Sequence, residues 1–156
     1  MISLLLTHRH RAGQLLVLLQ FGLLLWLAWA AAPALMQGHV TLACVLLGSL
    51  SALLGGWTLA YNRLGNFNIH PAPKAHGFLV TGGPYRLIRH PMYSTVLLAA
   101  AAMAVLTSPV AGGLAWCALA GVLGVKATLE ERWLCEHHAD YATYSQHTRR
   151  FVPWLF

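Results

Sequence analysis

Long apolar segments separated by short polar ones predict membrane-spanning helices in this chain. No Lys, Arg, Asp or Glu occurs from Ala12 to Asn62, and that stretch is long enough for two spans of about 20 residues each. Two more apolar segments follow the polar run in the middle of the chain. We expect the four spans at residues 13–32, 40–61, 93–107 and 110–127. The pattern therefore predicts an all-α integral membrane protein with about four transmembrane helices.

The third and fourth spans are expected to extend beyond their apolar segments. The third is short, so we expect its helix to begin inside the polar run that precedes it. The fourth has no proline after Pro109 until Pro153, and its helical pattern continues through Glu130, Glu131 and Cys135. At 1.5 Å per residue, this helix should carry the two glutamates out of the membrane to the level of the 62–91 loop.

Composition and charge agree with a membrane protein and suggest its orientation. Hydrophobic residues make up 58% of the chain and charged residues 9%, far below the roughly 25% charged content of a soluble domain, so a large soluble domain and a nucleic-acid partner are excluded. Cations occur before the first span, between the second and third, and after the fourth. The positive-inside rule then places both termini and the central loop in the cytoplasm, most simply at a bacterial inner membrane.

Cysteine and histidine give little sign of a metal site. The chain has no CxxC pair and therefore no thiolate cluster motif. The histidine pairs lack the i,i+4 spacing with a nearby carboxylate that is typical of a zinc helix. We predict no metal site, although a metal- or haem-binding protein stays open as an alternative. The pairs considered are His8/His10, His70/His76 and His137/His138.

A polar run, GGPYRLIRHPMY at residues 82–93, stands out in this apolar chain. The protein's acidic residues all lie later, from Glu130 to Asp140. A simple interpretation treats Tyr85 and Tyr93 as interfacial aromatics and the arginines as snorkelling anchors. That interpretation does not explain why residues 66–90 are so rich in Pro and Gly, which is typical of an ordered, extended segment.

GPYRLIRHPMY, a later LEERWL and the tail DYATYSQHTRRFVP together resemble the isoprenylcysteine carboxyl methyltransferase family. That superfamily also includes the phospholipid N-methyltransferases. The resemblance covers residues 62–153 and implies a methyltransferase that uses S-adenosylmethionine. We expect one membrane domain: the apolar pattern gives an N-terminal hairpin at 1–61, and the resemblance implies a cytoplasmic cofactor loop at 62–92 and a catalytic hairpin with a cytoplasmic tail at 93–156.

The resemblance assigns site residues one by one. Arg89 and Glu131 are the expected catalytic residues. Arginine suits the cofactor's carboxylate, and carboxylates suit its hydroxyls and cations. Adjacent helix residues point about 100° apart, so one glutamate should face the ligand. We expect this to be Glu131, because Glu130 has Lys126 as an available partner. The expected cofactor-binding residues are Gly83, Tyr85, Arg89, His90, Pro91, Tyr93, Glu130 and Glu131.

Methyl transfer mainly requires positioning and exclusion of water. A carboxylate acceptor arrives ionised and needs no base, whereas a protonated amine must first lose a proton. The scarcity of acids therefore favours a lipophilic carboxylate, such as an isoprenylcysteine, that enters from the bilayer. Phospholipid amine N-methylation, a non-catalytic membrane scaffold and, more weakly, a nicotinamide-dependent reductase remain alternatives. We expect membrane lipids as neighbours and a monomer by default.

The C-terminal tail and two departures from the family pattern complete the sequence-based picture. Arg149 and Arg150 are expected to contact anionic headgroups, at about 1 kcal/mol per cation. Alternatively, the tail closes the cofactor pocket with its tyrosines, Tyr141 and Tyr144. Thr95 stands where the family commonly has Gly, and His137-His138 where it has Phe-Gly. These departures bear on substrate identity more than on cofactor class.

Overall fold

A computed structural model describes residues 2–66 and 79–155, with side chains described from residue 11 onward and outside 63–65. Within these ranges the protein is all-helical and has no strand, apart from one isolated bridge. The central part of the predicted cofactor loop, residues 67–78, lies outside the described residues. The elements are α1 (Ile2–Met36), α2 (Leu42–Asn66), the short 3-10 helix η1 (Gly83–Arg86), α3 (Pro91–Ala104), α4 (Pro109–His137) and α5 (Tyr141–His147).

Three helices in the described part of the chain are long and apolar enough to cross a bilayer, namely Arg11–Met36, Leu42–Asn62 and Pro109–His137. The remaining predicted span, α3, has 14 residues, or about 21 Å, which is shorter than a hydrocarbon core of about 30 Å. It begins at Pro91, inside the polar run, as expected. Large apolar side chains such as Trp29 and Leu53 are exposed, as lipid contact requires. The protein is an integral membrane protein.

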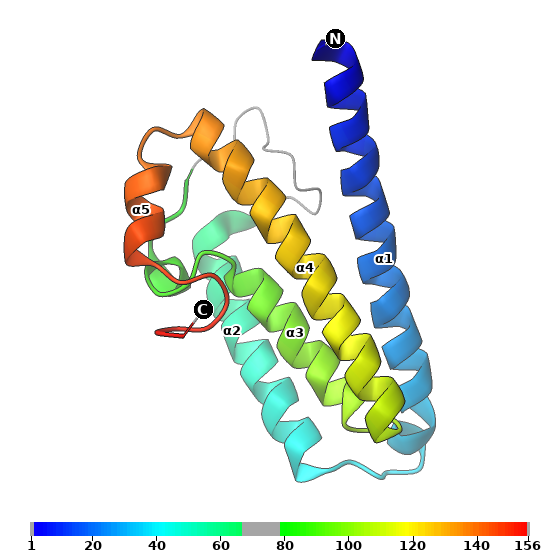
Figure 1. Cartoon of the computed structure of the whole chain (residues 1–156). Coiled ribbons are helices and arrows are strands. Elements are labelled where there is room, and N and C mark those ends of the chain that lie inside the picture. Colours follow the sequence, from blue (N-terminus) through cyan, green and yellow to red (C-terminus); the bar gives the residue numbers. More distant parts are fainter. Residues whose placement is uncertain (1, 67–78, 156) are drawn as a thin grey trace.

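The helices pack in an order that differs from their order in the sequence. α2 packs against α3, α3 against α4, and α1 against α4 and α3 rather than mainly against α2. Figure 1 shows α1 and α2 diverging from the turn that joins them. The core lies where α1, α3 and α4 meet. It consists of Leu27, Ala100, Ala115, Leu119 and Leu123.

Both helix-connecting turns lie at one end of the bundle, whereas η1, α5 and the start of α1 lie at the other (Figure 1). Ser108 caps α4 by accepting a hydrogen bond from the amide of Ala111, and Pro109 fits the first turn, where no intrahelical partner is needed. The polar run and the tail are thereby brought to the same end. That this end faces the cytoplasm stays a prediction.

Two of the polar contacts that cross the helix interfaces involve Lys126. Lys126 of α4 is only 1% exposed, and its Nζ donates to Gln20 Oε1 of α1 at 2.6 Å. The same ammonium lies 5.3 Å from the ring centroid of Tyr93 in α3. On the opposite side of α3, the side chain of Thr95 packs against Gly55, where a Cβ would approach it to 3.0 Å. Gly55 thus allows α2 to approach α3 closely at Thr95, a position that departs from the family pattern.

Candidate functional site

The polar run begins with a turn that is shaped around an aromatic ring. Gly83 has φ +58°, a backbone conformation that residues other than Gly rarely adopt. A Cβ at Gly83 would also lie 2.5 Å from the ring of Tyr61. Pro84 then starts η1, and the carbonyl of Tyr85 accepts a hydrogen bond from Tyr144 Oη at 2.7 Å. The absence of a side chain at Gly83 therefore leaves room for the ring of Tyr61, which belongs to α2.

The backbone just before α3 pairs with the C-terminal tail. Ile88 and Arg149 form a parallel bridge. The amide of Arg89 donates to the carbonyl of Arg149 at 2.7 Å, and the amide of His90 donates to that of Arg150 at 3.1 Å. This pairing holds the arginine and histidine of the polar run in a fixed register with the tail. Pro91 follows as the first residue of α3.

Glu131 is at the centre of a cluster of cationic and polar groups. Its Oε1 accepts from Arg89 Nε at 2.8 Å and lies 3.0 Å from His90 Nε2. Its Oε2 accepts from Arg150 Nη2 at 2.7 Å. The Glu131 side chain is 14% exposed, so these bonds are partly shielded from water and stronger than surface ion pairs. Three chain segments are thus joined on one carboxylate.

Arg89 connects this cluster to the tail. Its Nη1 donates to the carbonyl of Ser145 at 2.9 Å and also to the carbonyl of Thr148. These carbonyls lie at the C-terminal end of α5, where backbone acceptors lack intrahelical donors. A cation is favourable at that position. Arg89 therefore positions α5 and the tail against the polar run.

Glu130 has a different environment from its neighbour. Its Oε2 accepts from Tyr93 Oη at 2.8 Å and lies 3.8 Å from His90 Nδ1. The side chain is 33% exposed, against 14% for Glu131, and no described residue donates a hydrogen bond to its Oε1. His90 stacks on Tyr93 with centroids 5.2 Å apart. Glu130 thus presents one oxygen that a ligand could use.

Three tyrosines of the site end of the bundle are shielded and stay neutral. Burial, and then the charge of Glu130, raises the pKa of the Tyr85 hydroxyl. Burial raises the pKa of Tyr144 to about 12. Burial, and then the charge of Glu131, raises the pKa of Tyr141. Each hydroxyl therefore keeps its proton and can donate a hydrogen bond, as Tyr144 does to the carbonyl of Tyr85.

Tyr141 differs from Tyr144 in having no partner. The residue is 2% exposed, and within the described part of the chain its Oη is buried without a hydrogen bond. A buried hydroxyl in this condition costs about 1–3 kcal/mol, and such groups often lie where a ligand or water completes them. The ring packs edge-on against Tyr144, with centroids 5.7 Å apart.

The structure brings five of the predicted site residues into one cluster and places the other three around it. The clustered residues are Arg89, His90, Tyr93, Glu130 and Glu131. Gly83 contacts Tyr61, Tyr85 contacts Tyr144 through its backbone, and Pro91 begins α3. Whether any of them binds a cofactor stays a prediction.

Sequence reasoning considered that the tail closes the pocket with its tyrosines, but it missed the contributions of Arg150 and Phe151. Arg150, expected at lipid headgroups, instead forms an ion pair with Glu131, and these hydrogen bonds raise the pKa of its guanidinium. Phe151 packs its ring near His90, and its carbonyl accepts from Ser94 Oγ at 2.6 Å. In the sequence, the pair of arginines after α5 was the only sign of this contact, and it did not indicate which arginine binds Glu131.

Metal coordination has little support in the described residues. They contain no group of three or more His, Cys, Asp or Glu side chains that could hold a metal ion. His137 Nδ1 lies 2.8 Å from the carbonyl of Trp133, a contact within its own helix. His70 and His76 lie outside the described residues, and the side chains of His8 and His10 are not described.

A family model described as phospholipid methyltransferase matches residues 36–140, more than half of the chain. The chain belongs to the phospholipid methyltransferase family. This family match includes the polar run and both glutamates, whereas Arg150 and the rest of the tail lie beyond it. The protein is therefore a member of a methyltransferase family, and its long apolar helices embed it in a membrane.

The chain is also similar to a protein whose name refers to metal resistance. It is 29% identical over 151 residues to the cobalt-zinc-cadmium resistance protein CzcN of Cupriavidus metallidurans. The match covers 94% of this chain and 65% of that relative, so the chain spans less than two thirds of the relative's length. No solved structure matches the chain.

Proposed function

We propose that this protein binds S-adenosylmethionine at the cluster around Glu131 and transfers its methyl group to a lipophilic carboxylate. Family membership supports methyl transfer, and the observation that supports this location is the buried Tyr141 hydroxyl beside the charged cluster. The cluster is polar and partly shielded at one end of an apolar bundle. A polar cofactor and a lipophilic acceptor could therefore approach it from different phases.

The described residues fit the cofactor's chemistry. Tyr141 Oη has a proton to donate and no described acceptor. Glu130 Oε1 is available for a hydroxyl or an ammonium group, and the guanidinium of Arg89 or Arg150 suits a carboxylate. When bound, S-adenosylmethionine supplies a sulfonium methyl that an acceptor attacks in line, so that the carbon–sulfur bond breaks as the new bond forms and a neutral thioether leaves.

The geometry gives the two glutamates different roles in this proposal. Glu131 already accepts from Arg89 and Arg150 and contacts His90, so it positions the segments that surround the ligand. Glu130, whose Oε1 accepts no hydrogen bond from a described residue, is the better candidate for direct contact with the ligand. The choice of Glu131 as the ligand-facing residue stays a prediction, which variants of both glutamates can test.

Local charge supports an anionic acceptor. Arg150 binds the carboxylate of Glu131, and Arg132 of α4 lies near Arg150, so this side of the cluster has two cations for one carboxylate, while Glu130 binds Tyr93. Such a field attracts a carboxylate and repels a protonated amine. The family's description favours the alternative, a phospholipid amine, and Glu130 is the described carboxylate that could take a proton from it.

Calorimetric binding of S-adenosylhomocysteine to the protein in nanodiscs tests the cofactor site. We expect micromolar binding that Arg89→Ala, Glu130→Gln and Tyr141→Phe each weaken. Asp140→Asn, at an exposed carboxylate whose side chain makes no cap hydrogen bond to α5, is the matched control and should bind like the native protein. Equal binding by all variants would contradict the proposed site, and no binding by any of them would favour a non-catalytic scaffold.

Methyl-labelled S-adenosylmethionine distinguishes the two acceptor classes. A methyl ester releases its label as methanol in mild base, whereas an N-methyl group keeps it. We expect base-labile label in the lipid extract after incubation with native membranes. Base-stable label that disappears in Glu130→Gln at saturating cofactor would instead establish amine methylation.

A further inference from the structure

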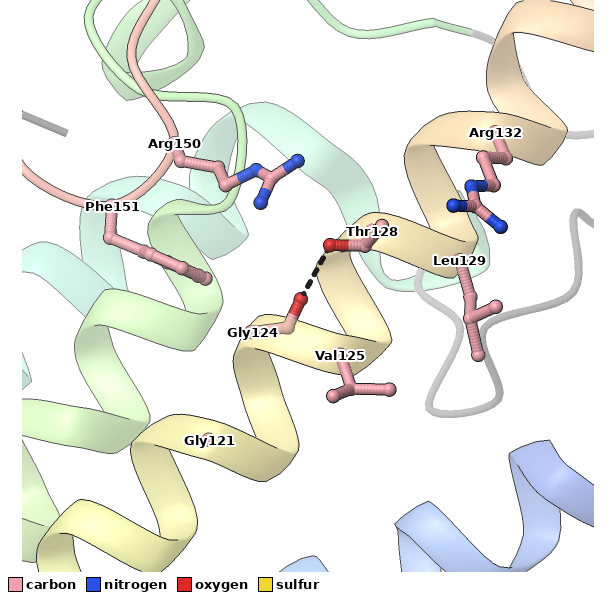
Figure 2. A pocket seen from close by; sticks show the side chains of 8 residues that line it. All are labelled: Gly121, Gly124, Val125, Thr128, Leu129, Arg132, Arg150 and Phe151. Carbon is pink, nitrogen blue, oxygen red and sulfur yellow. Dashed lines mark hydrogen bonds between the residues drawn. The ribbon is translucent and has the colours of Figure 1, made fainter.

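An open groove of about 480 Å³ lies on the face of α4 next to the C-terminal tail (Figure 2). Most of its lining is apolar. Gly121 lies at one end of the labelled stretch of helix and Arg132 at the other, while Arg150 and Phe151 border the groove from the tail. Arg132 lies eleven positions after Gly121 in the helix, which corresponds to about 16 Å along the axis.

Gly121 and Gly124 line the apolar part of the groove, and helix packing does not require a glycine at either position. A Cβ at Gly121 or Gly124 would have no neighbour within 4 Å. On the same helix, a Cβ at Gly112 would lie 2.5 Å from a backbone carbonyl of α3, so close packing explains that glycine. Glycine inside a helix costs about 1 kcal/mol relative to alanine. At Gly121 and Gly124 no close packing explains this cost, and the missing side chains leave a hollow on the outer surface of α4.

The other end of the groove is cationic. Arg150 uses Nε and Nη2 to bind Glu131, and within the described part of the chain its Nη1 makes no hydrogen bond. Arg132 is exposed on α4 and lines the same groove. In Figure 2 both guanidiniums lie beyond Gly124 along the labelled helix, Arg150 level with Thr128 and Arg132 at the far end of the stretch. The groove thus combines a hollow apolar strip with a terminal positive charge.

We propose that this groove binds the acceptor as a single-chain amphiphile that ends in a carboxylate. The hydrocarbon chain lies along Gly121, Gly124 and Val125, and the carboxylate lies at Arg150 and Arg132. The inference rests on the methyl-transfer function proposed above, because Arg150 connects the groove directly to Glu131. The volume is in the lower half of the range of about 300–1,000 Å³ for ligand pockets, which suits one chain better than the two chains of a glycerophospholipid.

Photolabelling of the full chain in nanodiscs tests the proposal without requiring cofactor or turnover. The probe is 10-azistearate, a long-chain carboxylate with a diazirine in its chain, and labelled peptides are mapped by mass spectrometry. We expect label on α4 around residues 121–129. Gly124→Leu, which fills the hollow, should reduce that label at least about tenfold, in line with the cost of overpacking a site.

Matched variants and probes separate the groove from general lipid contact. Gly113→Leu places the same side chain on α4 where a Cβ also meets nothing, outside the groove lining, and should keep full labelling. Gly121→Leu replaces Gly124→Leu if the latter fails to fold. Arg132→Gln should lower labelling by about two- to fivefold, as expected for an exposed charge pair.

Three outcomes would overturn the proposal. Equal labelling by the methyl ester of the probe would show that the carboxylate is not recognised. Stronger labelling by a phosphate amphiphile with the same chain would identify a phospholipid as the occupant. Native labelling in both Gly124→Leu and Gly121→Leu, with methyl transfer intact, would place the acceptor elsewhere. Labelling that follows the expected pattern in a protein without methyl transfer would support the groove while refuting the proposed reaction.

Discussion

Replacing Tyr141 by Phe should raise stability and weaken cofactor binding at the same time. The hydroxyl of Tyr141 is buried and has no hydrogen-bond partner among the described residues, and such a group costs about 1–3 kcal/mol. Removing it should therefore stabilise the ligand-free protein by about 1 kcal/mol, or about 2–4 °C in Tm for a chain of this size. If the hydroxyl binds a charged group of the cofactor, its loss should cost about 1.5–3 kcal/mol of binding, or roughly 10- to 150-fold in Kd.

Thermal unfolding in nanodiscs and calorimetry with S-adenosylhomocysteine measure the two effects of Tyr141→Phe separately. Tyr144→Phe is the matched control, because the Tyr144 hydroxyl already donates to the Tyr85 carbonyl at 2.7 Å. That variant should lose about 1 kcal/mol of stability. The reasoning fails if Tyr141→Phe loses stability as Tyr144→Phe does, or if it gains stability while Kd stays the same.

Three further substitutions test the packing around the site. Glu131→Gln should destabilise the protein by about 3 kcal/mol, because it leaves two partly buried guanidiniums without their carboxylate, and an unchanged Tm would show that the ion pairs contribute nothing. Gly112→Ala should lower Tm, since its Cβ would meet a carbonyl of α3, whereas Gly113→Ala, with open space around its Cβ, should raise it slightly through helix propensity. Similar Tm values for the two alanine variants would contradict this packing. Gly83→Ala should lower Tm by more than the roughly 1–2 kcal/mol cost of a left-handed backbone, because its Cβ would also clash with the ring of Tyr61; a smaller loss would mean that the ring moves freely.

Much of the fold could be predicted from the sequence because hydropathy reports directly on helices in a bilayer. The long uncharged stretch predicted α1 and α2, and Ser108-Pro109 marked the turn before α4. The extension of α4 past both glutamates was confirmed, since it ends at His137. Hydropathy could not predict that α1 packs against α4 rather than mainly against α2, because apolar faces alone do not specify which helix they meet.

The candidate site could be predicted only in part because its last members come from the tail. RHPxY and the glutamate pair indicated the polar run and α4, which indeed meet through Arg89 and Glu131. Nothing in the tail's composition distinguished an arginine that binds Glu131 from one that binds a headgroup. That distinction depends on the bridge between Ile88 and Arg149, which is set by tertiary structure. The choice between the two glutamates likewise depended on contacts of the tail.

The hydrogen bond between Lys126 and Gln20 has a consequence for assembly in the membrane. A lysine at the centre of an inserting helix costs about 2.5–3.5 kcal/mol, and Lys126, at the end of the predicted span, costs less; α4 leaves the ribosome long after α1. Because α1 docks on α4 rather than mainly on α2, it must first stand in the bilayer as a stable single helix with Gln20 still facing lipid. When α4 arrives, each polar side chain relieves the other's cost of insertion. The earliest helix to be synthesised thus acts as a template for the latest, and docking of these two helices should be the step that commits the chain to its final topology.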